Sequence, residues 1–256
     1  MASISYQLYS SRNFAPLSNI LAMVSNAGYT QVEGHAGLIA DSTDAESLRE
    51  LLEKEGLSMP TCHFDLEMVK KDPRQVIEIA GILNIDCVYI PYLEVDNRPS
   101  DTASWRKFAY QLNEWGKPLR DANLTFGWHN HDFEFTEITS SIRPIDIILS
   151  ASNYISLELD VAWAMSTDTD VLNFVSQHRA RISAAHIKDI APAGHCLHED
   201  GWADVGHGTL DWESLFPALL AAGTQYFIME HDNPTDDKRF AKRSIEYASP
   251  LLNSLR

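Results

Sequence analysis

Residues 155–189 have the sequence ISLELDVAWAMSTDTDVLNFVSQHRARISAAHIKD, and this stretch contains one complete strand–helix–strand unit. Segments 155–161 and 182–187 are short and rich in residues that favour β-strands. Segment 168–179 between them has apolar residues at helical spacing. A strand, a helix and a second strand in this order predict two parallel strands joined by a crossover helix.

The same unit recurs along the rest of the chain. Strands are predicted at 4–9, 31–35, 57–63, 87–92, 124–129, 155–161, 182–187 and 226–231. Helices are predicted at 16–27, 44–55, 72–83, 102–122, 144–150, 168–179, 211–222 and 236–252, the fourth with a break near Gly116 and Pro118. This alternation predicts an α/β protein with one domain, residues 1–256, folded as a (β/α)8 TIM barrel with a closed parallel sheet. The turn after the first strand lacks GxGxxG and GxxxxGK motifs, which disfavours an open nucleotide-binding sheet.

The composition excludes several classes of partner. The chain has 36 acidic and 20 basic residues and a formal net charge of −16. Because such a surface repels phosphate backbones, we expect no nucleic-acid partner. The three cysteines are scattered and form no CxxC motif, which is typical of a protein from the reducing cytoplasm. We see no signal peptide and no apolar stretch of the ~18 residues that a membrane span needs, so no membrane association is expected.

Ionisable residues gather at the carboxyl ends of the predicted strands. Barrel enzymes place their active sites at this end of the barrel. Since side chains alternate with period two along a strand, Glu158 and Asp160 share one face, and so do His186 and Lys188. The residues selected in this way are Glu33, His63, His129, His131, Glu158, Asp160, His186, Lys188 and Glu230.

Strands five to eight each offer one metal-type ligand, namely His129, Asp160, His186 and Glu230. Two imidazoles and two carboxylates suit a transition-metal ion better than Ca²⁺, and we expect one divalent ion of Mn, Zn, Co, Fe or Mg. His131 is the alternative ligand from strand five. Lys188 provides a competing explanation, because its ammonium group would neutralise buried carboxylates without any metal.

Six segments carry a family resemblance: 32–34 (VEG), 61–66 (TCHFDL), 127–135 (GWHNHDFEF), 157–163 (LELDVAW), 186–189 (HIKD) and 205–212 (VGHGTLDW). In these segments the sequence resembles the sugar phosphate isomerase/epimerase family of xylose isomerase-like barrels. The resemblance implies a metal ion bound from strands five to eight. Asp160, His186 and Glu230 match that pattern, whereas His129 stands where many members have glutamate. This departure weakens the analogy with ketose 3-epimerases.

The resemblance implies an isomerase or epimerase that acts on a sugar, keto-sugar or inositol derivative through a metal-stabilised enediolate. Glu230 is the favoured base, with Glu158 and His131 as further catalytic residues. We expect Glu33, His63, Trp163 and Lys188 to contact a small carbohydrate substrate. Trp163 lies where members that act on free ketoses often have histidine, and it either stacks on a sugar or packs within the wall.

Three alternative functions remain open. A lyase or dehydratase acting on a keto-sugar or polyol would use the same enolate chemistry. An endonuclease IV-like phosphodiesterase would share the fold, but the negative charge opposes it. A carbohydrate-binding barrel without activity would need no metal. The long loop 192–208 is expected to be either a lid or a solvated loop, and a homo-oligomer is compatible with the sequence.

Overall fold

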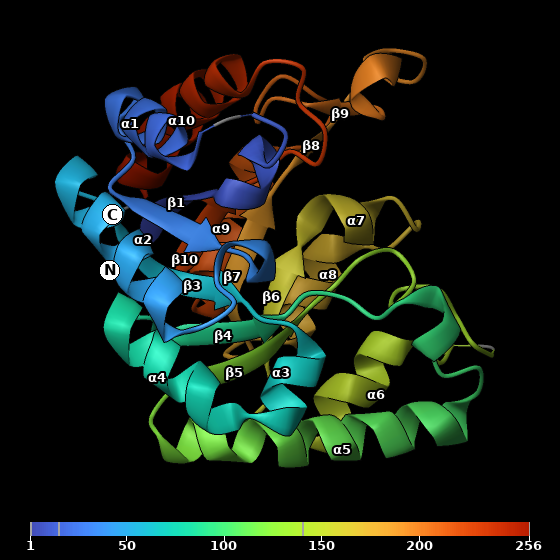
Figure 1. The fold of residues 1–256 in the computed structure, drawn as a ribbon. Helices are drawn as coiled ribbons and strands as arrows, with labels where there is room; N and C mark the ends of the chain where they lie inside the picture. The colour runs from blue at the N-terminus through green and yellow to red at the C-terminus, as the bar shows by residue number, and fades with distance from the viewer. Residues whose placement is uncertain (1, 15, 140, 256) are drawn as a thin grey trace.

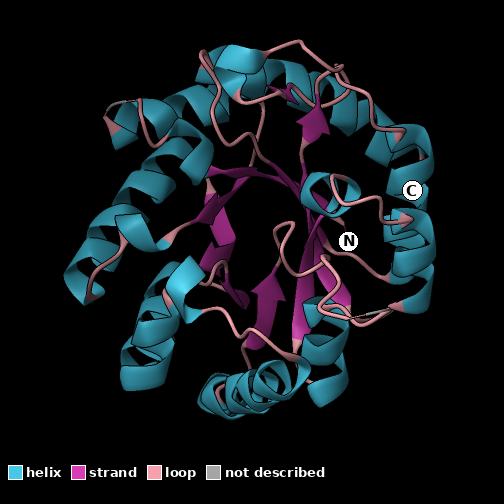
Figure 2. Cartoon of the chain, turned by 90° about the vertical axis from the view of Figure 1, so that its right-hand side faces the viewer, coloured by secondary structure: helices cyan, strands magenta, loops and turns pink. Residues whose placement is uncertain are grey.

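The computed structural model describes residues 2–14, 16–139 and 141–255. Within these residues, eight parallel strands form a closed barrel in the order β1–β10–β7–β6–β5–β4–β3–β2. Figure 2 shows the ring of strands with helices around it. The predicted TIM barrel is therefore confirmed. The barrel strands are β1 (Ser3–Gln7), β2 (Gln31–Gly34), β3 (Ser58–His63), β4 (Cys87–Ile90), β5 (Thr125–His129), β6 (Ser156–Asp160), β7 (Ile182–Ile187) and β10 (Tyr226–Met229).

Helices cover the outside of the barrel and pack their apolar faces onto it (Figure 1). Gly28, Gly56 and Gly223 end three of them in left-handed conformations, as expected for residues just past a helix C-terminus. The described helices are α1 (Leu17–Ala27), α2 (Ser42–Glu55), α3 (Leu66–Lys71), α4 (Pro73–Leu83), α5 (Thr102–Asp121), α6 (Pro144–Ala151), α7 (Val161–Met165), α8 (Val171–Gln177), α9 (Trp212–Ala222) and α10 (Asp237–Ser254).

The predicted break near Gly116 and Pro118 is wrong, because α5 runs without interruption through both residues. Gly116 is needed there for packing: a Cβ atom at this position would lie 2.0 Å from the ring of Phe126 on β5. Other boundaries also differ from expectation. The first strand ends at Gln7, since Leu8–Ser11 forms a 3-10 helix (η1), and the predicted helix 168–179 shortens to α8.

A short antiparallel ribbon rises from the rim of the barrel. It consists of β8 (Asp189–Ile190) and β9 (Trp202–Ala203), with Trp202 paired to Ile190. The buried carboxylate of Asp189 holds the base of this ribbon. Asp189 accepts hydrogen bonds from the backbone N–H groups of Ile190, Gly206 and Leu210 and from the indole N–H of Trp212, at 2.9–3.1 Å. The ribbon is thus fixed to the barrel wall.

A second anchor holds the same loop on its outer side. Glu199 accepts hydrogen bonds from the backbone and hydroxyl of Thr235, both at 2.6 Å, and from Arg239 at 2.8 Å. Asp204 pairs with Arg239 and with Arg243 on α10. Loop 192–208 is therefore bound to the start of α10 rather than solvated along its length.

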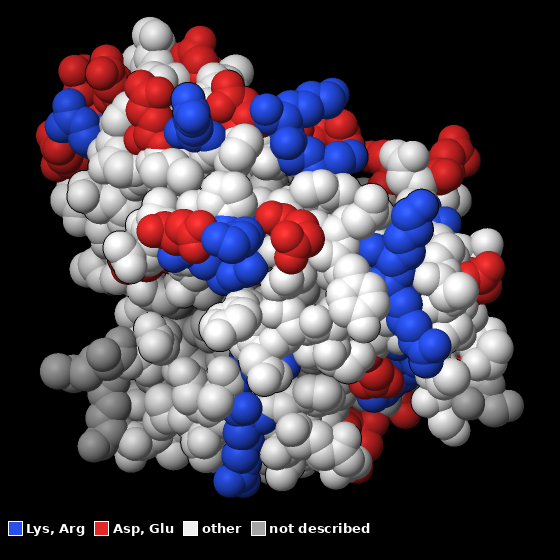
Figure 3. Space-filling view, turned by 90° about the horizontal axis from the view of Figure 1, so that it is seen from below, with Lys and Arg blue, Asp and Glu red and all other residues white. Residues whose placement is uncertain are grey.

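The surface combines charges of both signs. On the face seen from below in Figure 1, acidic and basic side chains lie interspersed among uncharged ones (Figure 3). Among the described helices, none is both long and apolar enough to cross a membrane.

Two helical glycines provide a matched test of the packing. Gly81→Ala on α4 meets open space, so it should stabilise the protein by up to about 1 kcal/mol through helix propensity. In Gly116→Ala on α5, the added Cβ atom would collide with the buried ring of Phe126. This substitution should destabilise the protein by about 1–3 kcal/mol. Thermal unfolding would show opposite shifts of the melting temperature. Equal shifts of the same sign would contradict the packing described for α5.

The Glu199 anchor predicts a specific acid sensitivity. Burial would raise the pKa of Glu199, but its bonds to Thr235 and Arg239 outweigh burial and lower the pKa to about 2. A lowered pKa means that the stabilisation is complete above about pH 4.5 and is lost as the pH falls towards 2. Glu199→Gln should lower stability by about 1–2 kcal/mol at pH 7. The difference in melting temperature between wild type and variant should shrink between pH 4.5 and 2, and a constant difference would argue against this anchor.

Candidate active site at the barrel mouth

The polar residues at the strand ends converge in the mouth of the barrel. Asn130 links two of these ends, because its amide donates to the carbonyl of Asp160 at 3.2 Å and its oxygen accepts from the Asp160 N–H at 3.0 Å. This exchange aligns the ends of β5 and β6. It leaves the side chain of Asp160 inside the barrel, where it also caps α7 through the N–H of Trp163.

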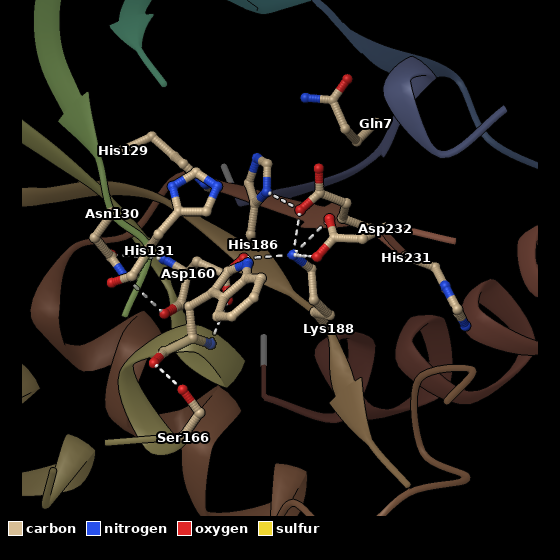
Figure 4. A network of polar contacts seen from close by, with 12 residues as sticks. Gln7, His129, Asn130, His131, Asp160, Ser166, His186, Lys188, His231 and Asp232 are labelled. Carbon is tan, nitrogen blue, oxygen red and sulfur yellow. Dashed lines mark hydrogen bonds and ion pairs between the residues drawn. The ribbon is translucent and has the colours of Figure 1, made fainter. Parts of the chain in front are cut away.

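Lys188 lies at the centre of this mouth and has no solvent exposure (Figure 4). Its Nζ lies 2.9 Å from Asp160 Oδ2, 2.8 Å from Glu230 Oε2 and 2.9 Å from Asp232 Oδ2. Burial would lower the pKa of Lys188, but these carboxylates outweigh burial and raise it well above its usual value. Lys188 is therefore a buried charged residue that pairs with carboxylates. Its contact with substrate stays a prediction.

His186 connects two levels of the site. Its Nδ1 lies 2.8 Å from Glu230 Oε2, and its Nε2 lies 2.6 Å from Glu33 Oε1. Gln7 also donates to Glu33 Oε1, at 2.7 Å. Glu33 is fully buried and lies behind His186, so its expected role in contacting substrate is revised. The carboxylate of Glu33 instead orients the imidazole, as acidic partners of metal-binding histidines do.

A deeper layer is built around Glu158. Its Oε2 lies 2.5 Å from His63 Nε2, 3.1 Å from His129 Nδ1 and 3.4 Å from His186 Nε2. Burial, reinforced by the nearby charge of Glu33, raises the pKa of Glu158 to about 8. Glu158 is fully buried and lines none of the described cavities. A catalytic role for Glu158 stays a prediction.

The described donor atoms form two groups in which all atoms lie within 4.8 Å of one another. One group contains Asp160, His186 and Glu230, and the other contains His63, His129, Glu158 and His186. The four expected metal ligands thus do not fall together. Asp160, His186 and Glu230 are close to one another, whereas the Nδ1 of His129 points to Glu158.

The chemistry of the first group fits a divalent cation. Asp160 Oδ2 is buried and accepts no hydrogen bond from the described residues, although Lys188 pairs with it electrostatically. Buried oxygen atoms in this state favour a nearby cation. One imidazole with two carboxylates is also a donor set that Mn²⁺, Fe²⁺, Co²⁺ and Zn²⁺ accept. A metal ion bound here would share the carboxylates of Asp160 and Glu230 with the ammonium group of Lys188.

Carboxylates outnumber the cationic groups at the mouth. Burial raises the pKa of Asp160, and it raises that of Asp232 to about 6. Burial alone would also raise the pKa of Glu230, but Lys188 and His186 hold it well below its usual value. The raised pKa values of Asp160 and Asp232 indicate that the site has electrostatic capacity for further positive charge.

Two neighbouring cavities open at the mouth. The first, of about 420 Å³, is lined by His63, His129, His131 and Glu230, and we call it the reaction lobe. The second, of about 690 Å³, lies under the β8–β9 ribbon and is lined by Arg12, Trp163 and Trp202, and we call it the ribbon lobe. Tyr9, His131 and Asp232 line both. His131 and Trp163 therefore face open space, as expected of residues that contact substrate.

Sequence reasoning missed three contributors. Gln7 ends the first strand without a charge, so it did not stand out among the ionisable strand ends. Asp232 follows Glu230 at the period-two spacing that places both on one face, and this signal was available. Trp202 lies in a loop without periodicity, so only the folded chain places it near Trp163, with ring centroids 4.8 Å apart.

Comparison with solved structures supports this description of the fold. A sugar phosphate isomerase/epimerase from Parabacteroides distasonis ATCC 8503 superposes with a TM-score of 0.78 at 18% identity, covering 98% of this chain and 96% of that chain. A probable 3-DHS dehydratase from Bacillus anthracis has a TM-score of 0.72 at 12% identity, with 97% and 99% covered. A structure titled IOLI protein with a binding zinc atom has a TM-score of 0.74 at 13% identity, with 99% of each chain covered.

Sequence comparisons give a complementary result. A search of curated proteins finds no match. The sequence profile of a family described as xylose isomerase-like TIM barrel matches residues 21–251, which is nearly the whole chain. The described fold is the barrel that this name specifies, and its mouth carries the polar strand ends. The chain belongs to the xylose isomerase-like TIM barrel family.

Proposed function

We propose that this protein is a divalent-metal-dependent isomerase or epimerase of a sugar, keto-sugar or inositol derivative. The observation that carries the proposal is the group of buried donors formed by Asp160, His186 and Glu230, with Glu230 also lining the reaction lobe. A similar fold in a sugar phosphate isomerase/epimerase, and in a structure with bound zinc, supports the same conclusion.

A divalent cation held by Asp160, His186 and Glu230 would polarise a substrate carbonyl and acidify the neighbouring C–H bond. The surrounding residues prepare this site. Glu33 and Gln7 hold His186 so that its Nδ1 faces Glu230. Lys188 keeps Glu230 ionised and holds it beside Asp160.

His131 and Glu230 are the groups placed to move protons in the reaction lobe. Lys188 and His186 hold the pKa of Glu230 well below its usual value, which favours its ionised form, and burial together with Lys188 lowers the pKa of His131 to about 3, which keeps its imidazole neutral near pH 7. The Nδ1 of His131 has no hydrogen-bond partner among the described residues. Both side chains line the lobe, which is the position that a general acid or base requires.

A lyase or dehydratase is the second candidate, and one observation favours it. The end of β5 presents the imidazole of His129 to the reaction lobe rather than a glutamate, and the glutamates on its lining are Glu230, just after β10, and Glu94. The pKa of His63 is raised because Glu33 and Glu158 outweigh the opposite effect of burial. This shift favours the protonated form of His63, and in that form its imidazole could donate a proton to a departing hydroxyl group during β-elimination. The fold of the probable 3-DHS dehydratase is consistent with this second candidate.

Metal binding tests the proposal directly. Purified protein dialysed against Mn²⁺, Zn²⁺ or Co²⁺ should retain about one ion per chain by elemental analysis, and chelation should lower its melting temperature. Asp160→Asn should abolish retention. Glu33→Gln should weaken metal affinity about 10–100-fold, because it alters the partner that orients His186.

Asp211→Asn provides the matched control, since Asp211 caps the exposed start of α9 outside the mouth. This variant should bind metal like wild type. Wild-type protein that retains no divalent ion under these conditions would refute the metal-dependent proposal. Equal retention by the Asp160 and Asp211 variants would refute the ligand assignment.

Proton exchange tests the role of His131. The protein incubated with a panel of keto-sugars and inososes in deuterated water should incorporate deuterium at the carbon next to the carbonyl. His131→Asn should slow this exchange about 10²–10⁴-fold while leaving metal content unchanged. A product that differs in mass from the substrate only by the incorporated deuterium identifies isomerisation or epimerisation, and an unsaturated product that has lost water identifies elimination. Exchange that is unaffected in the His131 variant would remove this residue from the mechanism.

A further inference from the structure

The ribbon lobe is not needed for the proposed chemistry. Of the groups proposed to bind metal and move protons, Glu230 and His131 line the reaction lobe, whose volume of about 420 Å³ is by itself sufficient for a small-molecule site. The larger ribbon lobe continues from it past Tyr9, His131 and Asp232. A ligand confined to the reaction lobe would leave the ribbon lobe to solvent. The mouth is therefore larger than a single small ring requires.

The walls of the ribbon lobe have the chemistry of a sugar-binding site. Trp163 and Trp202 pack edge to face at 4.8 Å and give an aromatic wall. The indole Nε1 of Trp163 is buried and has no hydrogen-bond partner among the described residues. Asp232, His195 and Asp200 add polar groups at the edges. Aromatic rings combined with a few placed polar groups bind the apolar faces and hydroxyl groups of a sugar ring.

The aromatic wall is preformed. Trp202 pairs with Ile190 in the β8–β9 ribbon, and Asp189 holds the base of that ribbon through four hydrogen bonds. Lys188 Nζ lies 5.4 Å from the ring centroid of Trp163 and 5.0 Å from that of Trp202, which adds a cation–π contact to each. No loop has to close to complete this wall.

An anionic group is a poorer occupant of the ribbon lobe than a neutral ring. Arg12 is the basic residue on the lining, and it donates to the carbonyl of Tyr9 and stacks on the Tyr9 ring. Two carboxylates, Asp200 and Asp232, line the same lobe. Asp200 opposes a phosphate or a carboxylate, and Asp232, whose charge is paired with Lys188, offers such a group no attraction.

We propose that the ribbon lobe binds a second, neutral sugar ring, so that the substrate is a two-ring compound such as a keto-disaccharide. The reacting ring occupies the reaction lobe, and the second ring packs on Trp163 and Trp202. This inference rests on the proposed function for the assignment of the reacting ring. The preference for two-ring over one-ring sugars can be measured as binding alone, with sugars that do not react.

The test measures binding of unreactive sugars to the metal-loaded protein by titration calorimetry. The panel contains common neutral monosaccharides and the disaccharides composed of them. At least one disaccharide should bind ten or more times as tightly as either of its constituents. Trp202→Ala should remove most of that gain, and Trp202→Phe should retain much of it because an aromatic wall remains. Trp115→Ala, on α5 and outside both lobes, is the matched control and should retain the full gain.

Two results would overturn the inference. One is a panel in which no disaccharide exceeds its constituents tenfold, and the other is a Trp202→Ala variant that weakens mono- and disaccharides equally. Failure of the proposed function has a different signature, because selective disaccharide binding would persist without deuterium exchange or product formation. Conversely, turnover of single-ring keto-sugars with no gain from a second ring would leave the proposed function intact and remove the second subsite.

Discussion

The pairing of one buried ammonium group with three carboxylates controls the arrangement of the mouth. Lys188 is excluded from solvent, and a charge in that environment is stable only when it is compensated. Its partners Asp160, Glu230 and Asp232 come from the ends of β6 and β10, on either side of β7 in the barrel. The same contacts that satisfy Lys188 thus join three neighbouring strands and fix the depth of the carboxylates.

A second level of polar groups lies below this one, with His186 shared between the two. Its two nitrogen atoms face carboxylates on opposite sides, Glu230 and Glu33. Because the ring cannot rotate without breaking both contacts, the identity of the nitrogen that faces the mouth is determined by the protein. These polar groups occupy part of the barrel interior that apolar side chains would otherwise fill. The surrounding apolar core has to compensate for the free energy that burying them costs.

The sequence predicts the barrel because strands, helices and their order leave local patterns. It also predicts which residues lie at the strand ends, since period-two alternation identifies inward-facing positions. It does not predict their depth. Glu33 and Glu158 point inward as expected, but the stagger of the strands places them beneath the mouth. The separation of His129 from Asp160 and Glu230 likewise depends on side-chain rotamers and on contacts with His63 and Glu158 from other strands. Such pairings arise only when the barrel closes.

The loop that carries Trp202 is secured by Asp189 at its base and by its own residues Glu199 and Asp204, which pair with Arg239 on α10. Between these attachments, residues such as Leu197 are open to solvent. A segment with fixed ends and an exposed tip can vary in length and sequence while the barrel stays unchanged. If the proposed function holds, the substrate range can therefore diversify, or be redesigned, by exchanging one loop tip, because the residues proposed to transfer protons lie elsewhere.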